Sequence, residues 1–324
     1  MAKGSTGEPV RDLQRRLAGL GFDSGSEEHG SYGAGTEAAV RGFQEHRGLR
    51  VDGRCGPQTW ANLVEAGYRL GDRLLYHRSP MLRGDDVATL QRRLSALGFD
   101  TGRVDGIFGP QTARAVGEFQ RNAGLTVDAT CGRDTVAALH RLGDRGDAPS
   151  VVADVREREA FRSGPRTLVG QRIVVGQAGG LDAIVHAAAK LLSKAGAVVI
   201  ALNDPDESSQ AQQANDIGAS AYIGLAVAVT GSCCTSAYYA HSVTGTESAA
   251  GRRLAVQVQR TVPPALGLPD GGIRGMRVPI LRETRMPAVL CDLAPLSVVI
   301  ERSAALADAL LDATAAWIAD PLAD

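Results

Sequence analysis

The sequence is poor in aromatic residues and carries almost no net charge. Only 4% of its 324 residues are Phe, Trp or Tyr, so aliphatic side chains must supply most of the core packing. The formal net charge of -1 offers no electrostatic attraction for nucleic acid. No apolar run reaches the roughly 18 residues of a membrane-spanning helix, which excludes a transmembrane segment. The chain length predicts roughly two or three domains.

Two further features are missing, a metal-type cysteine pattern and a leader segment. The five cysteines show no ligand spacing; they are Cys55, Cys131, Cys233, Cys234 and Cys291. The first residues contain no apolar core of signal-peptide length. Both features favour a reducing compartment over export. We therefore expect a cytoplasmic protein that meets the membrane only through its partners, with export by an unusual route as the alternative.

An internal repeat fills the first part of the sequence. The segment Val10–Phe22 recurs as Val87–Phe99, and both copies contain Leu-Gln-Arg-Arg-Leu followed by Leu-Gly-Phe. A second block, around Phe43-Gln44, recurs around Phe119-Gln120. Such close repetition indicates the duplication of one small domain. Apolar residues at helical spacing predict three helices in each copy.

The repeated pattern resembles the peptidoglycan-binding domain type 1, a three-helix module attached to many cell-wall enzymes. The resemblance implies a glycan-facing groove near the DG-x-x-G-x-x-T turns. The matching ligand-binding candidates are Asp52, Gly53, Gly56, Thr59, Asp105, Gly106, Gly109, Thr112, Asp128, Gly132 and Thr135. A purely structural role is the alternative for each, because turns need Asp and Gly and helix starts favour Thr. The first copy departs from the pattern, since Glu27-Glu-His-Gly30 stands where Val104-Asp-Gly106 stands in the second.

Beyond the repeat, a polar stretch leads into a segment that alternates strands and helices. Residues 144–167 have no apolar face and are predicted to form a linker. The expected elements after it are strands at 172–175, 197–202, 221–229 and 288–293, and helices at 186–194, 210–217, 247–261 and 303–319. This order predicts an α/β domain with a mostly parallel sheet. We thus expect two all-α modules at 1–70 and 80–143, the linker, and an α/β domain at 168–320.

The α/β segment resembles the zinc-dependent N-acetylmuramoyl-L-alanine amidases of the type 3 class. Three stretches carry the resemblance: Arg172–Val175 before a Gly-rich turn, Gly218–Leu225, and Arg274–Asp292. The resemblance implies a Zn²⁺ ion held by two His and one Glu, with a further Glu as general base.

The residues expected to hold zinc are replaced in this sequence. The two His positions fall on Ala178 and Ala226, and the general base falls on Asp292, which is one methylene shorter than Glu. The stretch that should carry the ligand Glu is short and has only Asp182 as an acid. Because metal affinity depends on these ligands, we expect no bound metal and no cofactor, with zinc only if an unrecognised ligand set exists.

Other ligand sets and other chemistries fit less well. A replacement zinc site would have to use residues without zinc-type spacing: His186, His241, Cys233, Cys234 and Asp182. We interpret His186 as a hydrogen-bonded core histidine and Cys233-Cys234 as loop thiols. The turn Gly176–Gly180 lacks the Lys and Ser or Thr of a phosphate loop. No nucleophile elbow of the G-x-S-x-G type is present.

These observations predict a pseudoenzyme, a non-catalytic cell-wall protein that regulates peptidoglycan biosynthesis. Two peptidoglycan-binding modules ahead of a degenerate amidase domain are similar to actinobacterial amidase-like regulators. This similarity implies as partners a peptidoglycan fragment or lipid-linked precursor, and the enolpyruvyl transferase of precursor synthesis. Two alternatives stay open: an active zinc amidase with a non-standard site, and a plain wall-binding protein.

Overall fold

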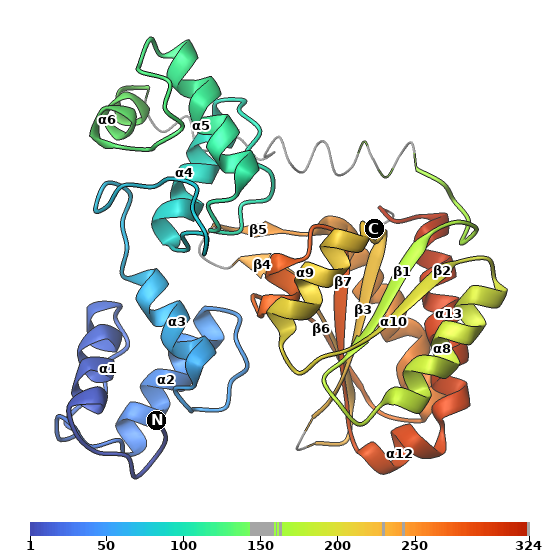
Figure 1. Cartoon of the computed structure of the whole chain (residues 1–324). Coiled ribbons are helices and arrows are strands. Elements are labelled where there is room, and N and C mark those ends of the chain that lie inside the picture. The colour runs from blue at the N-terminus through green and yellow to red at the C-terminus, as the bar shows by residue number, and fades with distance from the viewer. Residues whose placement is uncertain (143–158, 160, 162–163, 229–230, 242–243, 323–324) are drawn as a thin grey trace. The chain divides into compact units, whose positions relative to one another are not determined.

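The computed structural model describes residues 1–142, 159, 161, 164–228, 231–241 and 244–322 (Figure 1). The chain forms two compact units. The helical unit comprises Met1–Arg156 with Ser242–Thr246, and the α/β unit comprises Glu157–His241 with Glu247–Asp324. Most of the predicted linker at 144–167 lies outside the described residues. None of the helices described is long and apolar enough to cross a membrane.

The helical unit contains three helices in each copy of the repeat, as predicted. They are α1 (Glu8–Gly19), α2 (Ala34–His46), α3 (Pro57–Ala66), α4 (Asp85–Ala96), α5 (Pro110–Asn122) and α6 (Arg133–Arg141). Each helix buries an apolar stripe, which on α4 includes Val87, Leu90 and Leu94. Gly21 and Gly98 follow α1 and α4 with φ of 87° and 91°, a left-handed conformation that lets the chain leave the helix.

The two copies of the repeat have separate cores. An edge-on pair of Phe rings lies in each core, with centroids 5.7 and 5.6 Å apart: Phe22–Phe43 and Phe99–Phe119. The chain that connects the copies joins the second core through Leu75, which is fully buried. Its backbone pairs with Cys131 in both directions, at N···O distances of 3.2 and 2.8 Å.

Two ion pairs join the second copy to the first copy and to the connecting segment within the helical unit. Arg47, only 3% exposed, follows α2 and forms a bidentate pair with Asp85 at the start of α4, both N···O distances being 2.7 Å. A cation at one helix's carboxyl end and an anion at the next helix's amino end both suit the helix dipoles. Arg73 of the connecting segment pairs with Asp86 at 2.7 Å and covers the ring of Tyr68. Side chains, and not only the backbone, therefore join the copies.

The α/β unit is built on a seven-stranded mixed sheet. Its strands are β1 (Arg172–Gln177), β2 (Val198–Asn203), β3 (Ala221–Val227), β4 (Cys234–His241), β5 (Thr246–Glu247), β6 (Asp270–Met276) and β7 (Ala288–Leu293). The order is β2-β1-β3-β7-β4-β5, with β6 paired to β4. The pairs β1–β2, β1–β3, β3–β7 and β4–β6 are parallel, and β4–β7 is antiparallel. The predicted mostly parallel sheet is confirmed.

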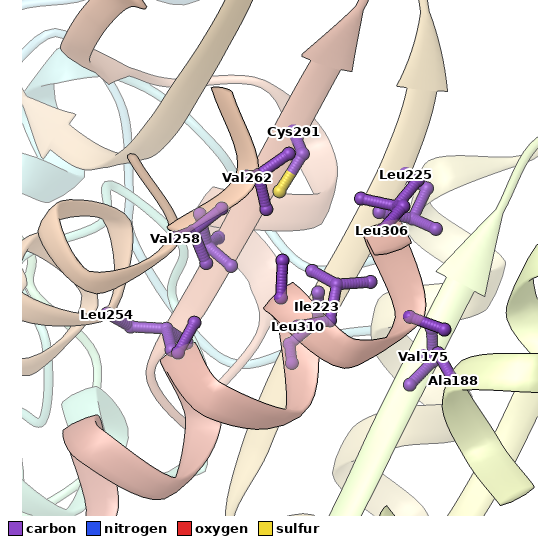
Figure 2. Close-up of a cluster of buried hydrophobic side chains, with 14 of the residues drawn as sticks. Val175, Ala188, Ile223, Leu225, Leu254, Val258, Val262, Cys291, Leu306 and Leu310 are labelled. Atoms are coloured by element: carbon purple, nitrogen blue, oxygen red, sulfur yellow. The ribbon is translucent and has the colours of Figure 1, made fainter. Parts of the chain in front are cut away.

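Helices cover both faces of this sheet. They are α8 (Asp182–Lys194), α9 (Glu207–Ile217), α10 (Ala249–Leu266), α11 (Pro279–Glu283), α12 (Leu296–Glu301) and α13 (Ser303–Ala319). One face packs against α8, α10 and α13, and the other packs against α9 and α11. Figure 2 shows the first of these cores, in which Ile223 and Cys291 of the strands lie near Val258 of α10 and Leu310 of α13.

Three expectations for the α/β unit need correction. Cys234 is not a loop thiol, because it opens β4 and is fully buried. His186 is not in the core: it is exposed on α8, although its ring Nδ1 lies 2.7 Å from the carbonyl oxygen of Asp182. The sequence prediction also missed β4 and β6. β6 contains three glycines among seven residues, so its side chains show no clear alternation.

Candidate functional site

The turns predicted to face a glycan share one arrangement, built on a buried glutamine of the preceding helix. The four glutamines are Gln14, Gln44, Gln91 and Gln120, each at most 3% exposed. Each Nε2 donates to a Thr hydroxyl in the first turn of the next helix, namely Thr36, Thr59, Thr112 and Thr135, at 2.9 to 3.1 Å. These glutamines were not singled out in the sequence prediction. Their recurrence in the repeated Leu-Gln and Phe-Gln pairs was the signal that could have identified them.

Gln91 shows the arrangement in full. Its Nε2 also donates to Asp105 Oδ1 at 2.9 Å, and its Oε1 accepts the N–H groups of Asp105 and Gly106 at 3.1 and 2.8 Å. Asp105 Oδ1 in turn accepts the N–H of Ile107 at 2.8 Å. Gly106 has φ of 74°, which favours glycine. The Asp and Gly residues predicted as ligand candidates therefore also satisfy the polar groups of their own turn.

The turns after Gln44 and Gln120 repeat these contacts. Asp52 and Asp128 accept from Nε2 of their glutamines at 2.8 Å, as Asp105 does from Gln91. A hydrogen bond from the Thr130 N–H holds the pKa of Asp128 below its usual value. Ala129 replaces the glycine of this turn and keeps its left-handed backbone, with φ of 56°.

The first turn replaces the aspartate with a different carboxylate. His29 stands at the aspartate position, and Glu27 takes over the start of α2. The Glu27 carboxylate accepts the N–H groups of Gly33 and Gly35, each at 2.6 Å, and the hydroxyl of Thr36 at 2.6 Å. Burial alone would raise the pKa of Glu27, but these hydrogen bonds bring it below its usual value. The departure seen in the sequence is therefore compensated locally.

The positions predicted to form the degenerate zinc site lie in one row across three adjacent strands. Ala226 of β3 is in register with Asp292 of β7. Gln177, which ends β1, is in register with Leu225, so Ala178 follows at the level of Ala226. The strands are parallel, and the row lies at their carboxyl edge, where α/β proteins place their reactive groups. The structure thus brings together three positions that are far apart in the sequence.

The side chains at this edge do not fit a zinc ion. Ala178 and Ala226 offer no donor atom, and Asp292, only 6% exposed, forms an ion pair with Arg274. Asp182 Oδ1 accepts hydrogen bonds from Gln177 Nε2 at 2.9 Å and from the Asn203 amide at 2.8 Å. Across the described parts of the chain, no three His, Cys, Asp or Glu side chains gather as metal ligands.

Amide side chains shape the Gly-rich turn beside this row. Gln177, which is buried, accepts the N–H groups of Gly179 and Leu181 at its Oε1, at 3.0 and 2.9 Å. The backbone carbonyl of Gln177 accepts a hydrogen bond from Gln210 Nε2 at 2.9 Å. The Oε1 atom of Gln210 in turn accepts from the Tyr222 hydroxyl at 2.7 Å. The amide groups of Gln177 and Gln210 therefore hold the turn, and Asp182 is the carboxylate that accepts from Gln177 Nε2.

Family models match three separate stretches of the chain. Residues 6–63 and 83–139 match the putative peptidoglycan binding domain, and residues 181–324 match the N-acetylmuramoyl-L-alanine amidase family. The N-acetylmuramoyl-L-alanine amidase CwlM of Mycobacterium tuberculosis is 36% identical over 327 residues, which cover 90% of this chain and 80% of the relative.

Two further matches each cover just under half of the chain. The N-acetylmuramoyl-L-alanine amidase CwlL of Bacillus licheniformis is 36% identical over 165 residues, 44% of this chain and 45% of that protein. The crystal structure of the N-acetylmuramoyl-L-alanine amidase from Clostridium difficile 630 matches 47% of this chain and 98% of its own, with 17% identity and a TM-score of 0.39. By its sequence, the chain belongs to the N-acetylmuramoyl-L-alanine amidase family and carries two peptidoglycan-binding domains ahead of the amidase domain.

Proposed function

We propose that this protein is a non-catalytic member of the amidase family that binds peptidoglycan-type ligands and regulates peptidoglycan biosynthesis. The observation that carries the proposal is the row of Ala178, Ala226 and Asp292 at the carboxyl edge of the sheet. Methyl groups stand where the family pattern calls for imidazoles, and zinc affinity depends on such ligands. The remaining carboxylate is engaged by Arg274. With neither imidazole present, this edge lacks the ligands that would hold a zinc ion to activate water.

Ligand binding is assigned to the two modules of the helical unit, whose family match supports a peptidoglycan ligand. Within each turn the Thr hydroxyl is buried beneath the glutamine amide, whereas the Asp residues are exposed or half-exposed. We therefore assign glycan contact to Asp52, Asp105 and Asp128 and to the half-exposed glycines that begin the next helices, Gly56, Gly109 and Gly132. The Thr residues position the turn and do not touch the ligand.

Metal analysis combined with an activity assay tests the loss of catalysis. The full chain is incubated with excess zinc, desalted and analysed for bound metal, and the same sample is incubated with purified muropeptides. We expect less than stoichiometric zinc and no release of stem peptides, whereas an amidase with an intact ligand set, treated in parallel, retains zinc and releases peptides. Stoichiometric zinc together with peptide release would establish the alternative of an active amidase with a non-standard site.

The regulatory part of the proposal concerns the partner and its location. Its support is the domain combination, which is similar to amidase-like regulators of precursor synthesis. The expected partners are a peptidoglycan fragment or lipid-linked precursor and the enolpyruvyl transferase of precursor synthesis, met in the cytoplasm. Affinity capture from cell lysate should recover one of these, and cell fractionation should place the chain in the cytoplasm. Recovery of none, with the chain sedimenting on purified sacculi and fractionating with the wall, would favour a plain wall-binding protein.

A further inference from the structure

The sheet of the α/β unit ends in an unprotected strand. β2 lies at one end of the strand order, and β1 is its strand partner in the part of the chain that the structure describes (Figure 1). Its residues, Val198–Asn203, include no charged residue and no proline, and its register with β1 is continuous. Charges, prolines and bulges are the devices by which proteins block pairing at an open edge. Because β2 has none of them, it can accept another strand.

The hydrogen bonds to β1 show which backbone groups face the open side. The N–H groups of Val198 and Asp204 donate to β1 or the residue before it, at 2.8 and 3.3 Å. Backbone direction alternates along a strand, so the N–H and C=O groups of Val199, Ala201 and Asn203 point away from β1. Ala201 and Asn203 are exposed, as is Val198 at 53%. The helices on either face thus leave the outer side of β2 accessible.

We propose that β2 pairs in antiparallel orientation with β2 of a second copy of this chain, joining the two sheets into one. Because the outward groups belong to alternate residues, the two-fold axis falls at Ala201, which pairs with Ala201 of the second copy. Val199 then pairs with Asn203, and about six backbone hydrogen bonds form across the axis. Ile200 lies opposite Leu202 as a close non-hydrogen-bonded pair, which covers the half-buried Ile200 side chain.

The charges at the two ends of β2 favour a second copy in this orientation. Lys190 and Lys194 occupy the last turns of α8, which leads into the amino end of β2, and both are exposed. Asp204 and Asp206 follow the carboxyl end. Antiparallel pairing brings the acidic end of one copy toward the basic end of the other, and parallel pairing would bring like charges together. One chain therefore carries both halves of the complementary pattern, as an isologous dimer requires.

Small changes at Ala201 test the pairing without disturbing the β1–β2 ladder. In Ala201→Pro, the N–H that is lost faces outward, so the variant removes two hydrogen bonds of the dimer and none within the sheet. In Ala201→Lys, two cations meet on the two-fold axis. Ala201→Ser keeps both the N–H and the small side chain and serves as the matched control. Sedimentation equilibrium of the full chain over a range of concentrations measures the dimer dissociation constant.

The wild-type chain and Ala201→Ser should be dimers of equal affinity. Ala201→Pro and Ala201→Lys should raise the dissociation constant at least about tenfold, with unchanged far-ultraviolet circular dichroism. If Ala201→Pro fails to fold, Ala201→Lys alone tests the pairing. Lys is common on natural edge strands, so this variant should fold. A monomeric wild-type chain would overturn the proposal, and so would a dimer that persists in folded Ala201→Lys. A dimer would place four peptidoglycan-binding modules in one particle, which increases avidity for a polymeric ligand.

Discussion

Replacement of Glu27 tests whether a carboxylate from outside the usual turn pattern stabilises the first module. The amino end of α2 begins at Gly33, which has no side chain to cap the helix. Glu27 supplies the missing acceptor for the N–H groups of Gly33 and Gly35 and for the Thr36 side chain. Loss of a helix cap costs about 0.5–2 kcal/mol. Since several donors lose a charged acceptor at once, we expect Glu27→Ala to cost about 2 kcal/mol, and Glu27→Gln about 1 kcal/mol.

The assay uses the positions of the two tryptophans. Trp60 lies on α3 of the first module and Trp317 on α13 of the α/β unit, so Trp317→Phe leaves Trp60 as the single fluorescent reporter of the first module. Urea unfolding of the Glu27 variants is measured in this background. The matched control is Glu28→Gln, which removes the exposed charge of the adjacent residue. Equal midpoints for Glu27→Gln and Glu28→Gln would refute the capping role.

The stability of the same variants should also differ in its dependence on pH. The folded-state pKa of Glu27 is lowered, so the unfolded chain binds the proton more tightly than the folded chain does. This contribution to stability is present above the ordinary glutamate pKa of about 4.3 and is lost as the pH falls through the lower folded-state pKa. The wild-type module should therefore lose more stability between pH 6 and pH 3 than the Glu27→Gln variant, whereas Glu28→Gln should follow the wild type. Parallel pH profiles for wild type and Glu27→Gln would contradict the assignment.

Three further substitutions probe the other contacts by urea unfolding. Ala129→Gly relieves a left-handed alanine and should stabilise the second module by about 0.5–1 kcal/mol; a destabilised variant would argue against strain at this turn. Arg47→Ala leaves the Asp85 carboxylate without its guanidinium and should lower the unfolding free energy of the helical unit by about 2–3 kcal/mol. The double variant with Asp85→Ala should recover part of this loss, and additive losses would exclude an energetic coupling between the two side chains. Gln177→Ala removes the acceptor of two turn N–H groups and should cost about 2–3 kcal/mol, read from Trp317; an unchanged midpoint would show that water replaces the amide.

Local pattern was sufficient for most of the helices and for four of the strands, β1, β2, β3 and β7. Apolar stripes such as that of α4 specify one buried face, and runs such as Ile173–Val175 specify a buried strand, because both periods follow from backbone geometry alone. β6 escaped prediction because its glycines show no alternation, and its place in the sheet depends on pairing with β4. Cys234 was predicted to lie in a loop because β4 was also missed. The place of β4 in the sheet depends on its pairing with β6 and β7.

The sequence by itself determined the duplication and the α/β order, because both are properties of residue identity and spacing. The assignment of Ala178 and Ala226 to imidazole positions is a prediction that depends on the resemblance to the zinc amidases. Only the tertiary structure decided which residues meet. Strand register set Ala178, Ala226 and Asp292 in one row, and packing joined Asp292 to Arg274 and the four buried glutamines to their turns. Sheet order alone left β2 at an open edge. Contacts between distant segments depend on how elements pair and pack, and no local period in the sequence encodes that arrangement.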